Sequence, residues 1–138
     1  MLKACSYCGK IHPKGYQCPL KPKRNYNRDR RKKAPSEADR YRHTARWISL
    51  SKIIKEREGC MCQACIHGLG SPLTPFEGGQ LEVHHIDSLE EHFEKRDDEE
   101  NLITLCKRHH SEAEAGAINT GQLKRIAGEN SKKAQMDY

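Results

Sequence analysis

The fold is decided by Leu81-Glu82-Val83-His84-His85-Ile86 together with Asn101-Leu102-Ile103-Thr104-Leu105-Cys106-Lys107-Arg108-His109-His110. These two stretches hold two pairs of adjacent histidines with an asparagine between them, and they follow Cys62-Gln63-Ala64-Cys65. On a strand, neighbouring side chains point to opposite faces, so one histidine can hold a metal while the next does another task. The pattern indicates a metal-dependent hydrolase built around a structural zinc.

The structural zinc is predicted from two short chelating turns. Cys62-x2-Cys65 and Cys106-x2-His109 each place two ligands on one tight turn, and together they complete a tetrahedral shell with no open position. Such a site stabilises the fold rather than performing chemistry. Cys60 could substitute in this shell, but the x2 spacing favours Cys62 and predicts a buried thiol at Cys60.

A second cysteine unit occupies residues 1–20. Its spacing is C-x2-C-x3-H-x5-C, formed by Cys5, Cys8, His12 and Cys18. Pro13 and Pro19 exclude a continuous helix here, so a small zinc knuckle is favoured over free cysteines at a frayed terminus. Two structural zinc ions are therefore expected in the chain.

The charge of the chain is unevenly distributed. The formal net charge is +6, yet residues 21–46 hold 11 Lys/Arg against 3 Asp/Glu, which leaves the rest of the chain slightly acidic. A basic segment beside a neutral or acidic body is typical of a tether for a phosphate backbone. A solvated linker without a partner is the alternative.

The composition limits the size of the core and the compartment. The 138 residues are 35% hydrophobic and 6% aromatic, which allows one compact domain with an appendage and favours support by metal. There is no apolar run of membrane-spanning length and no hydrophobic segment after Met1. We therefore expect a cytoplasmic protein whose seven cysteines bind metal instead of forming disulfides.

The pattern of the chain predicts three regions. A knuckle at 1–20 and a basic linker at 21–38 precede a domain at 39–138. Ser36 with Asp39 forms helix-start chemistry for an amphipathic helix over 39–58, interrupted near Ser49–Ser51 and ended by Gly59.

The rest of the domain is predicted to be a core over about 60–117 and a helical tail. A turn-rich segment at 60–80 leads into a strand at 81–86, an acidic loop at 90–100, a second strand at 101–105 and a helix at 107–115. The tail is a weaker helix over 120–134.

Residues 40–118 resemble the HNH nucleases of the ββα-metal class. The resemblance is carried by His84-His85, Asn101 and His110, nested within Cys62, Cys65, Cys106 and His109. It implies an α+β, small zinc-stabilised fold: a ββα-metal (His-Me finger) core with flanking helices. Small bacteriophage HNH proteins look closest, and some of these act with the DNA-packaging terminase. The implied partners are double-stranded DNA and a phage terminase large subunit, in the cytoplasm of a host bacterium.

The resemblance also implies roles for single residues. His84 and His110 would hold a catalytic divalent metal (Mg, Mn, Ni or Zn), His85 would be the general base, and Asn101 would orient the His85 segment. Glu114 is either a third ligand or, as is more common, a solvated helix carboxylate. Many family members have Asp in place of His84 and Cys in place of His109, and both substitutions keep a ligand at the position.

Two other functions fit the sequence less well. A non-catalytic zinc-dependent DNA-binding or packaging adaptor would need neither His85 nor Asn101. A zinc deaminase needs a histidine followed two residues later by a glutamate, and neither His84 nor His85 has one. The sequence therefore predicts a metal-dependent DNA endonuclease that nicks or cuts duplexes.

Overall fold

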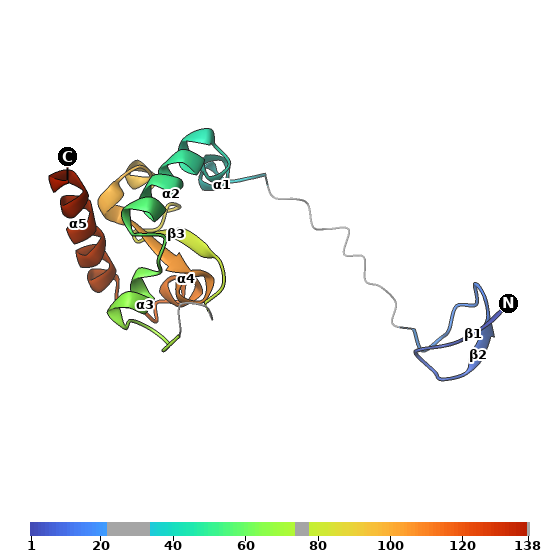
Figure 1. Ribbon diagram of the computed structural model, residues 1–138. Coiled ribbons are helices and arrows are strands. Elements are labelled where there is room, and N and C mark those ends of the chain that lie inside the picture. The colour runs from blue at the N-terminus through green and yellow to red at the C-terminus, as the bar shows by residue number, and fades with distance from the viewer. Residues whose placement is uncertain (22–33, 74–77, 138) are drawn as a thin grey trace. The chain divides into compact units, whose positions relative to one another are not determined.

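The computed structural model describes residues 1–21, 34–73 and 78–137, and it consists of two compact units, Met1–Ala34 and Pro35–Tyr138 (Figure 1). Most of the predicted basic linker, residues 22–33, lies outside the described residues, as do 74–77 of the turn-rich segment. Within the described ranges, no helix has the length and apolar character needed to cross a membrane.

The N-terminal unit is a small hairpin, which the sequence did not predict. Strand β1 (Leu2–Ala4) pairs antiparallel with β2 (Ile11–Pro13). Leu2 and Ile11 are 68% and 66% exposed, whereas Cys18 is buried. Among its described residues this unit therefore buries little apolar surface, and its cysteines lie at its centre.

The larger unit begins with two short helices where one helix over 39–58 was predicted. Helix α1 (Glu37–Arg42) starts with the predicted capping box between Ser36 and Asp39, and α2 (Ala45–Arg57) starts at the cap Thr44. The break lies at His43–Thr44 instead of Ser49–Ser51, because the Thr44 side chain accepts a hydrogen bond from the Trp47 amide and starts a new helix.

The centre of this unit is a two-stranded antiparallel sheet. Strand β3 (Leu81–His85) pairs with β4 (Leu102–Cys106), with His84 opposite Ile103 and His85 opposite Leu102. Alternation along the strands gives each face its own core. On one face Val83 and Leu102 pack with Ile54 of α2.

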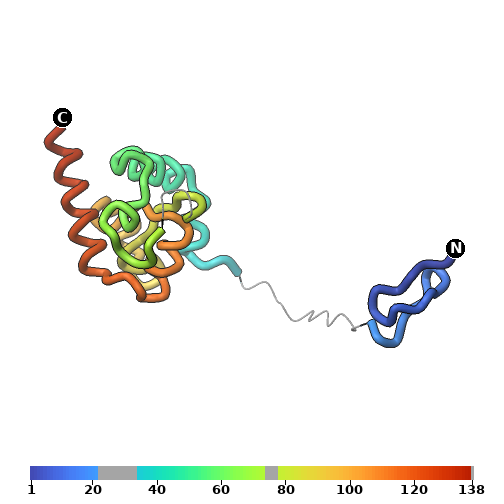
Figure 2. The backbone as a smooth tube through the Cα atoms, turned by 60° about the horizontal axis from the view of Figure 1, so that its bottom comes forward, coloured from blue at the N-terminus to red at the C-terminus, as the bar shows by residue number. Residues whose placement is uncertain are grey.

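Three further helices contact the hairpin, and Figure 2 shows α5 in red along one side of this unit. Helix α4 (Lys107–Glu114) follows β4 directly and contacts both strands. Helix α5 (Thr120–Met136), longer than the predicted 120–134, packs on β4. Helix α3 (Gln63–His67) was not predicted, since its short sequence lies in a stretch dominated by turn residues. The core on the face opposite to Val83 and Leu102 includes Ile103, Leu105, Ile118, Leu123, Ile126 and Ala127.

A buried ion pair attaches the end of α2 to β4. Arg57 Nη2 lies 2.6 Å from Glu58 Oε1, and both side chains are almost completely buried. The other oxygen of Glu58 accepts a hydrogen bond of 2.6 Å from the Thr104 amide, while Arg57 donates to the Leu102 carbonyl oxygen. These added hydrogen bonds satisfy charges that would otherwise be costly to bury.

Two local expectations need correction. Cys60, predicted to be a buried thiol, is exposed, because Gly59 and Cys60 both adopt positive φ in the turn that ends α2. The acidic segment predicted to be a loop contains two short 3₁₀ helices, η1 (Phe93–Lys95) and η2 (Glu99–Asn101). These turns matter for function because they place Arg96 and Asn101 beside β3.

Candidate functional site

Four cysteine and histidine side chains meet between α3 and the start of α4. Nδ1 of His109 lies 3.4 Å from Sγ of Cys62, 3.4 Å from Sγ of Cys65 and 3.3 Å from Sγ of Cys106. A tetrahedral zinc with Zn–S of about 2.3 Å and Zn–N of about 2.0 Å separates its sulfur and nitrogen ligands by roughly 3.5 Å. The donor set therefore has the chemistry and the spacing of a structural zinc site.

The three thiols of this cluster cannot all ionise without a positive charge among them. Burial raises the pKa of the Cys65 thiol to about 12, and the neighbouring Cys62 and Cys106 add to the effect. His109 presents Nδ1 to the sulfurs because its Nε2–H donates a hydrogen bond of 2.8 Å to the Ser71 carbonyl oxygen.

The loop before β3 fits closely around this cluster. The Gly78 backbone passes so near Cys106 that a Cβ at this position would overlap the Cys106 sulfur. The Gly78 carbonyl oxygen accepts a hydrogen bond of 3.1 Å from the Arg108 amide, in the first turn of α4. Glycine is therefore required where the loop meets the first turn of α4.

The N-terminal unit contains a cluster of the same composition. Ligand atoms of Cys5, Cys8, His12 and Cys18 all lie within 4.8 Å of one another. Hydrogen bonds from the Tyr7 and Cys8 backbone lower the pKa of the Cys5 thiol to about 7, so a thiolate forms there near neutral pH. Both predicted cysteine clusters are thus brought together, and both indicate zinc.

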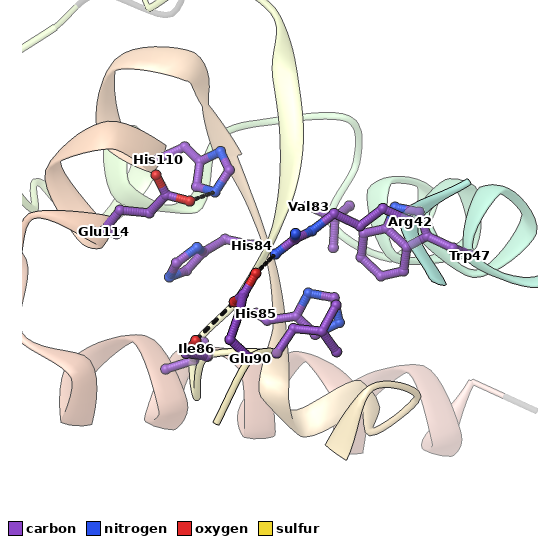
Figure 3. A pocket seen from close by; sticks show the side chains of 12 residues that line it. Arg42, Trp47, Val83, His84, His85, Ile86, Glu90, His110 and Glu114 are labelled. Atoms are coloured by element: carbon purple, nitrogen blue, oxygen red, sulfur yellow. Dashed lines mark hydrogen bonds and ion pairs between the residues drawn. The ribbon is translucent and has the colours of Figure 1, made fainter. Parts of the chain in front are cut away.

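A third group of metal-ligating side chains lies on the face of β3 that points to α4. His84, His110 and Glu114 each offer a ligand atom within 4.8 Å of the others. His84 comes from β3, while His110 and Glu114 are one turn apart on α4, with His110 Nε2 3.1 Å from Glu114 Oε1. Figure 3 shows all three on one side of the pocket. Glu114, the weakest of the sequence candidates, thus lies beside both histidines.

Glu82 positions His110 and was missed by the sequence analysis. Its carboxylate accepts a hydrogen bond from Nδ1 of His110, which leaves Nε2 directed at His84 and Glu114. A carboxylate behind a ligating histidine fixes the tautomer and orientation of the ring. Glu82 lies two residues before His84 and so on the same face of the strand, and that spacing was the available signal.

The His84 imidazole is kept neutral. Burial and the nearby rings of His110 and His85 lower its pKa to about 4. A neutral imidazole is the form that binds a metal, so protons do not compete for this nitrogen near neutral pH.

His85 lies on the opposite face and is held from three sides. Its ring stacks on Trp47, with centroids 4.7 Å apart at 24°, and lies edge-on to Tyr41 at 6.3 Å. Its Nε2–H donates a hydrogen bond of 3.1 Å to the Arg96 carbonyl oxygen, so Nδ1 keeps its lone pair. Burial, opposed by that carbonyl and aided by the charge of Arg42, holds the pKa of His85 below its usual value.

Asn101 fixes the turn that follows His85. Its Oδ1 accepts a hydrogen bond of 2.7 Å from the Asp87 amide, and its Nδ2 donates one of 3.2 Å to the Asp87 carbonyl oxygen. The Asp87 carboxylate is itself held by Lys124 and Lys95, whose hydrogen bonds lower its pKa to about 2. Asn101 therefore orients the backbone next to His85 without entering the pocket.

An open pocket of about 590 Å³ lies at β3. His84, His85, His110 and Glu114 line it together with Arg42 and Trp47, as Figure 3 shows. The pocket includes residues from both faces of β3, since among the described residues β3 pairs with β4 alone and its other edge is uncovered by a strand. The arrangement puts a metal-ligating group and an imidazole with a free lone pair on one cavity, which suits hydrolysis of an anionic ester.

Comparison with known proteins agrees with this geometry. Residues 62–116 match the model of the family described as HNH endonuclease. No curated protein and no solved structure matches the chain. The matched range contains the second cysteine cluster and the four pocket residues His84, His85, His110 and Glu114. HNH proteins are in general nucleases that bind DNA and metal, so this domain indicates nuclease activity in general terms.

Proposed function

We propose that this protein is a metal-dependent endonuclease that hydrolyses phosphodiester bonds in double-stranded DNA, with β3, β4 and α4 forming a ββα-metal core. One observation carries the proposal: a cluster of His84, His110 and Glu114 shares a pocket with His85, whose Nδ1 has a free lone pair. A structural zinc at Cys62, Cys65, Cys106 and His109 stabilises the base of α4.

Binding of the catalytic cation is assigned to three side chains on the α4 side of β3. His84 and His110 would hold a divalent cation, and Glu114 would add a carboxylate oxygen to the same shell. When bound, this cation supplies positive charge that stabilises the phosphate and the departing oxygen. Glu82 keeps His110 Nε2 turned to the site, and burial keeps His84 neutral.

The role of general base is assigned to His85. The Arg96 carbonyl oxygen holds the proton on Nε2, so Nδ1 can take a proton from an attacking water. Stacking on Trp47 fixes the plane of the ring, and the lowered pKa keeps it unprotonated at neutral pH. Asn101 fixes the backbone of Asp87, two residues after His85.

The test is cleavage of supercoiled plasmid by protein that keeps its tightly bound zinc but has lost exchangeable metal. We expect no cleavage until Mg, Mn, Ni or Zn is added, followed by conversion to nicked or linear DNA. His84→Ala and His110→Ala should abolish the metal response, whereas His67→Ala on α3, outside the pocket lining, should retain it. Salt-dependent DNA binding without cleavage under every metal would support the adaptor function and contradict this proposal.

The biological setting is a further part of the proposal. A phage-encoded protein that acts beside the terminase large subunit during DNA packaging rests on the sequence resemblance alone. Co-purification of the full chain with a terminase large subunit, compared with the chain lacking residues 1–35, would test it. Absence of any complex with the full chain would remove the packaging role and leave the nuclease proposal unchanged.

A further inference from the structure

Arg42, the last residue of α1, extends into the pocket that holds His84 and His85. Its Nη2 lies 3.0 Å from Glu90 Oε1 and its Nη1 lies 3.4 Å from Asp39 Oδ1. One of the dashed lines in Figure 3 joins Arg42 to Glu90. Arg42 belongs to none of the three metal-ligating groups of the described residues, and the roles proposed above do not use it.

The position of Arg42 is set by the buried residue before it. The Tyr41 ring packs beside Leu89 and Phe93, and its hydroxyl donates to Asp97 Oδ1 at 2.6 Å. This anchor fixes the end of α1 over the segment that follows β3, so the Arg42 backbone does not depend on the ion pair. Only the outer part of the Arg42 side chain has to move when its guanidinium exchanges one anionic partner for another.

Both partners of Arg42 can be displaced. The side chains of Arg42, Glu90 and Asp39 are 40%, 53% and 53% exposed, so each ion pair is weakened by water and salt. A guanidinium is planar and presents paired N–H donors, which match a phosphate as well as they match a carboxylate. A phosphodiester entering the pocket can therefore replace Glu90 at Arg42 at little cost.

The negative charges of the pocket also require a cationic side chain if DNA is to bind there. Glu90 and Glu114 both line the cavity, so an approaching DNA backbone meets two carboxylates there. Among the described residues that line this cavity, Arg42 is the one arginine, and no lysine lines it. We propose that Arg42 binds a backbone phosphate of DNA, and that Glu90 is a competing anion which holds Arg42 in the pocket until DNA displaces it.

This proposal rests on the proposed function for the identity of the ligand as DNA, but its test does not use cleavage. Binding of a fluorescent duplex of random sequence is measured by anisotropy with the full-length, zinc-containing protein and no added divalent metal. Arg42→Ala should weaken binding about tenfold, as expected for loss of a charge-assisted contact. Arg42→Lys should recover only part of it, because an ammonium cannot form the paired hydrogen bonds.

Glu90→Gln is the decisive variant, because it removes the competitor and should strengthen binding about twofold to fivefold. Glu91→Gln, an exposed neighbour with the same change of charge, should have a smaller effect. In the Arg42→Ala background, Glu90→Gln should add no more than Glu91→Gln does. Arg40→Ala, also exposed and on α1, controls for loss of one positive charge.

Two results would overturn the proposal: Glu90→Gln binding DNA no more tightly than Glu91→Gln, or Glu90→Gln keeping its full benefit without Arg42. Thermal unfolding of each variant confirms that the fold is retained. The expected binding pattern without metal-dependent cleavage would uphold this inference and defeat the proposed activity. Metal-dependent cleavage by the protein, with DNA binding unchanged in the Arg42 and Glu90 variants, would uphold the proposed activity and defeat this inference.

Discussion

His109 and His110 are adjacent on α4, yet their side chains lie in two different environments. His109 is fully buried and meets three cysteine sulfurs, whereas the His110 side chain is 22% exposed and meets two carboxylates and another imidazole. The thiolate cluster is closed on all sides by protein ligands. The imidazole and carboxylate cluster opens onto a pocket.

The difference follows from helix geometry and from what each turn faces. Successive residues of a helix are turned by about 100°, so one histidine points back to α3 and the loop while the next points to β3. Soft thiolate ligands favour a zinc held for structure, and harder nitrogen and oxygen ligands accept several divalent metals. One short helix can thus contribute side chains to two clusters with different ligand chemistry.

The largest expected effect comes from exchanging the two histidines for alanine in turn. His109→Ala should remove one zinc and lower the unfolding free energy of the larger unit by at least about 4 kcal/mol, since it breaks a metal site and leaves buried thiolates. His110→Ala should keep that zinc and the fold and lose only cleavage. Elemental analysis, thermal unfolding and plasmid cleavage separate the two outcomes. Comparable destabilisation in both variants would mean that the two sites do not differ in this way.

A smaller effect is expected from the carboxylate behind His110. Glu82→Gln keeps a hydrogen-bonding partner at His110 Nδ1 but removes its charge, so affinity for an added Ni or Mn ion should fall roughly 10- to 100-fold. Calorimetric titration of the zinc-containing protein measures it. The control is Glu129→Gln, on the exposed side of α5. Equal affinity in the two variants would show that Glu82 does not position a ligand.

The smallest effect on the larger unit should come from the first cysteine cluster. Cys8→Ser should remove one zinc and disrupt only the Met1–Ala34 unit, because its residues form a separate compact unit. The unfolding temperature of the larger unit should not change, whereas Cys65→Ser should lower it strongly. A shared shift in both variants would mean that the two clusters stabilise one folding unit.

The sequence predicted the two chelating turns well, because they depend on local spacing. Cys62-x2-Cys65 and Cys106-x2-His109 do meet, and β3, β4 and α4 have bounds close to those predicted. Helix α3 was missed because it is only five residues long and is held by the cysteine cluster more than by its own sequence.

The parts of the pocket that come from distant segments could not be predicted. Arg42 of α1 and Trp47 of α2 line the pocket with His85, and the Arg96 carbonyl oxygen after η1 accepts the hydrogen bond of His85. No local sequence pattern predicts these positions. The exposed Cys60 was also beyond the sequence, since spacing alone does not reveal a non-glycine residue at positive φ.

His85 as the base of a hydrolytic site is the central claim, and single-turnover cleavage of supercoiled plasmid by His85→Ala tests it most directly. The matched control is His92→Ala, a partly exposed histidine that pairs with Glu94 outside the pocket lining. We expect His85→Ala to lose about 10²- to 10⁴-fold in rate with zinc content, metal affinity and unfolding temperature unchanged, and His92→Ala to cleave normally. Undiminished cleavage by a folded His85→Ala variant would contradict the account.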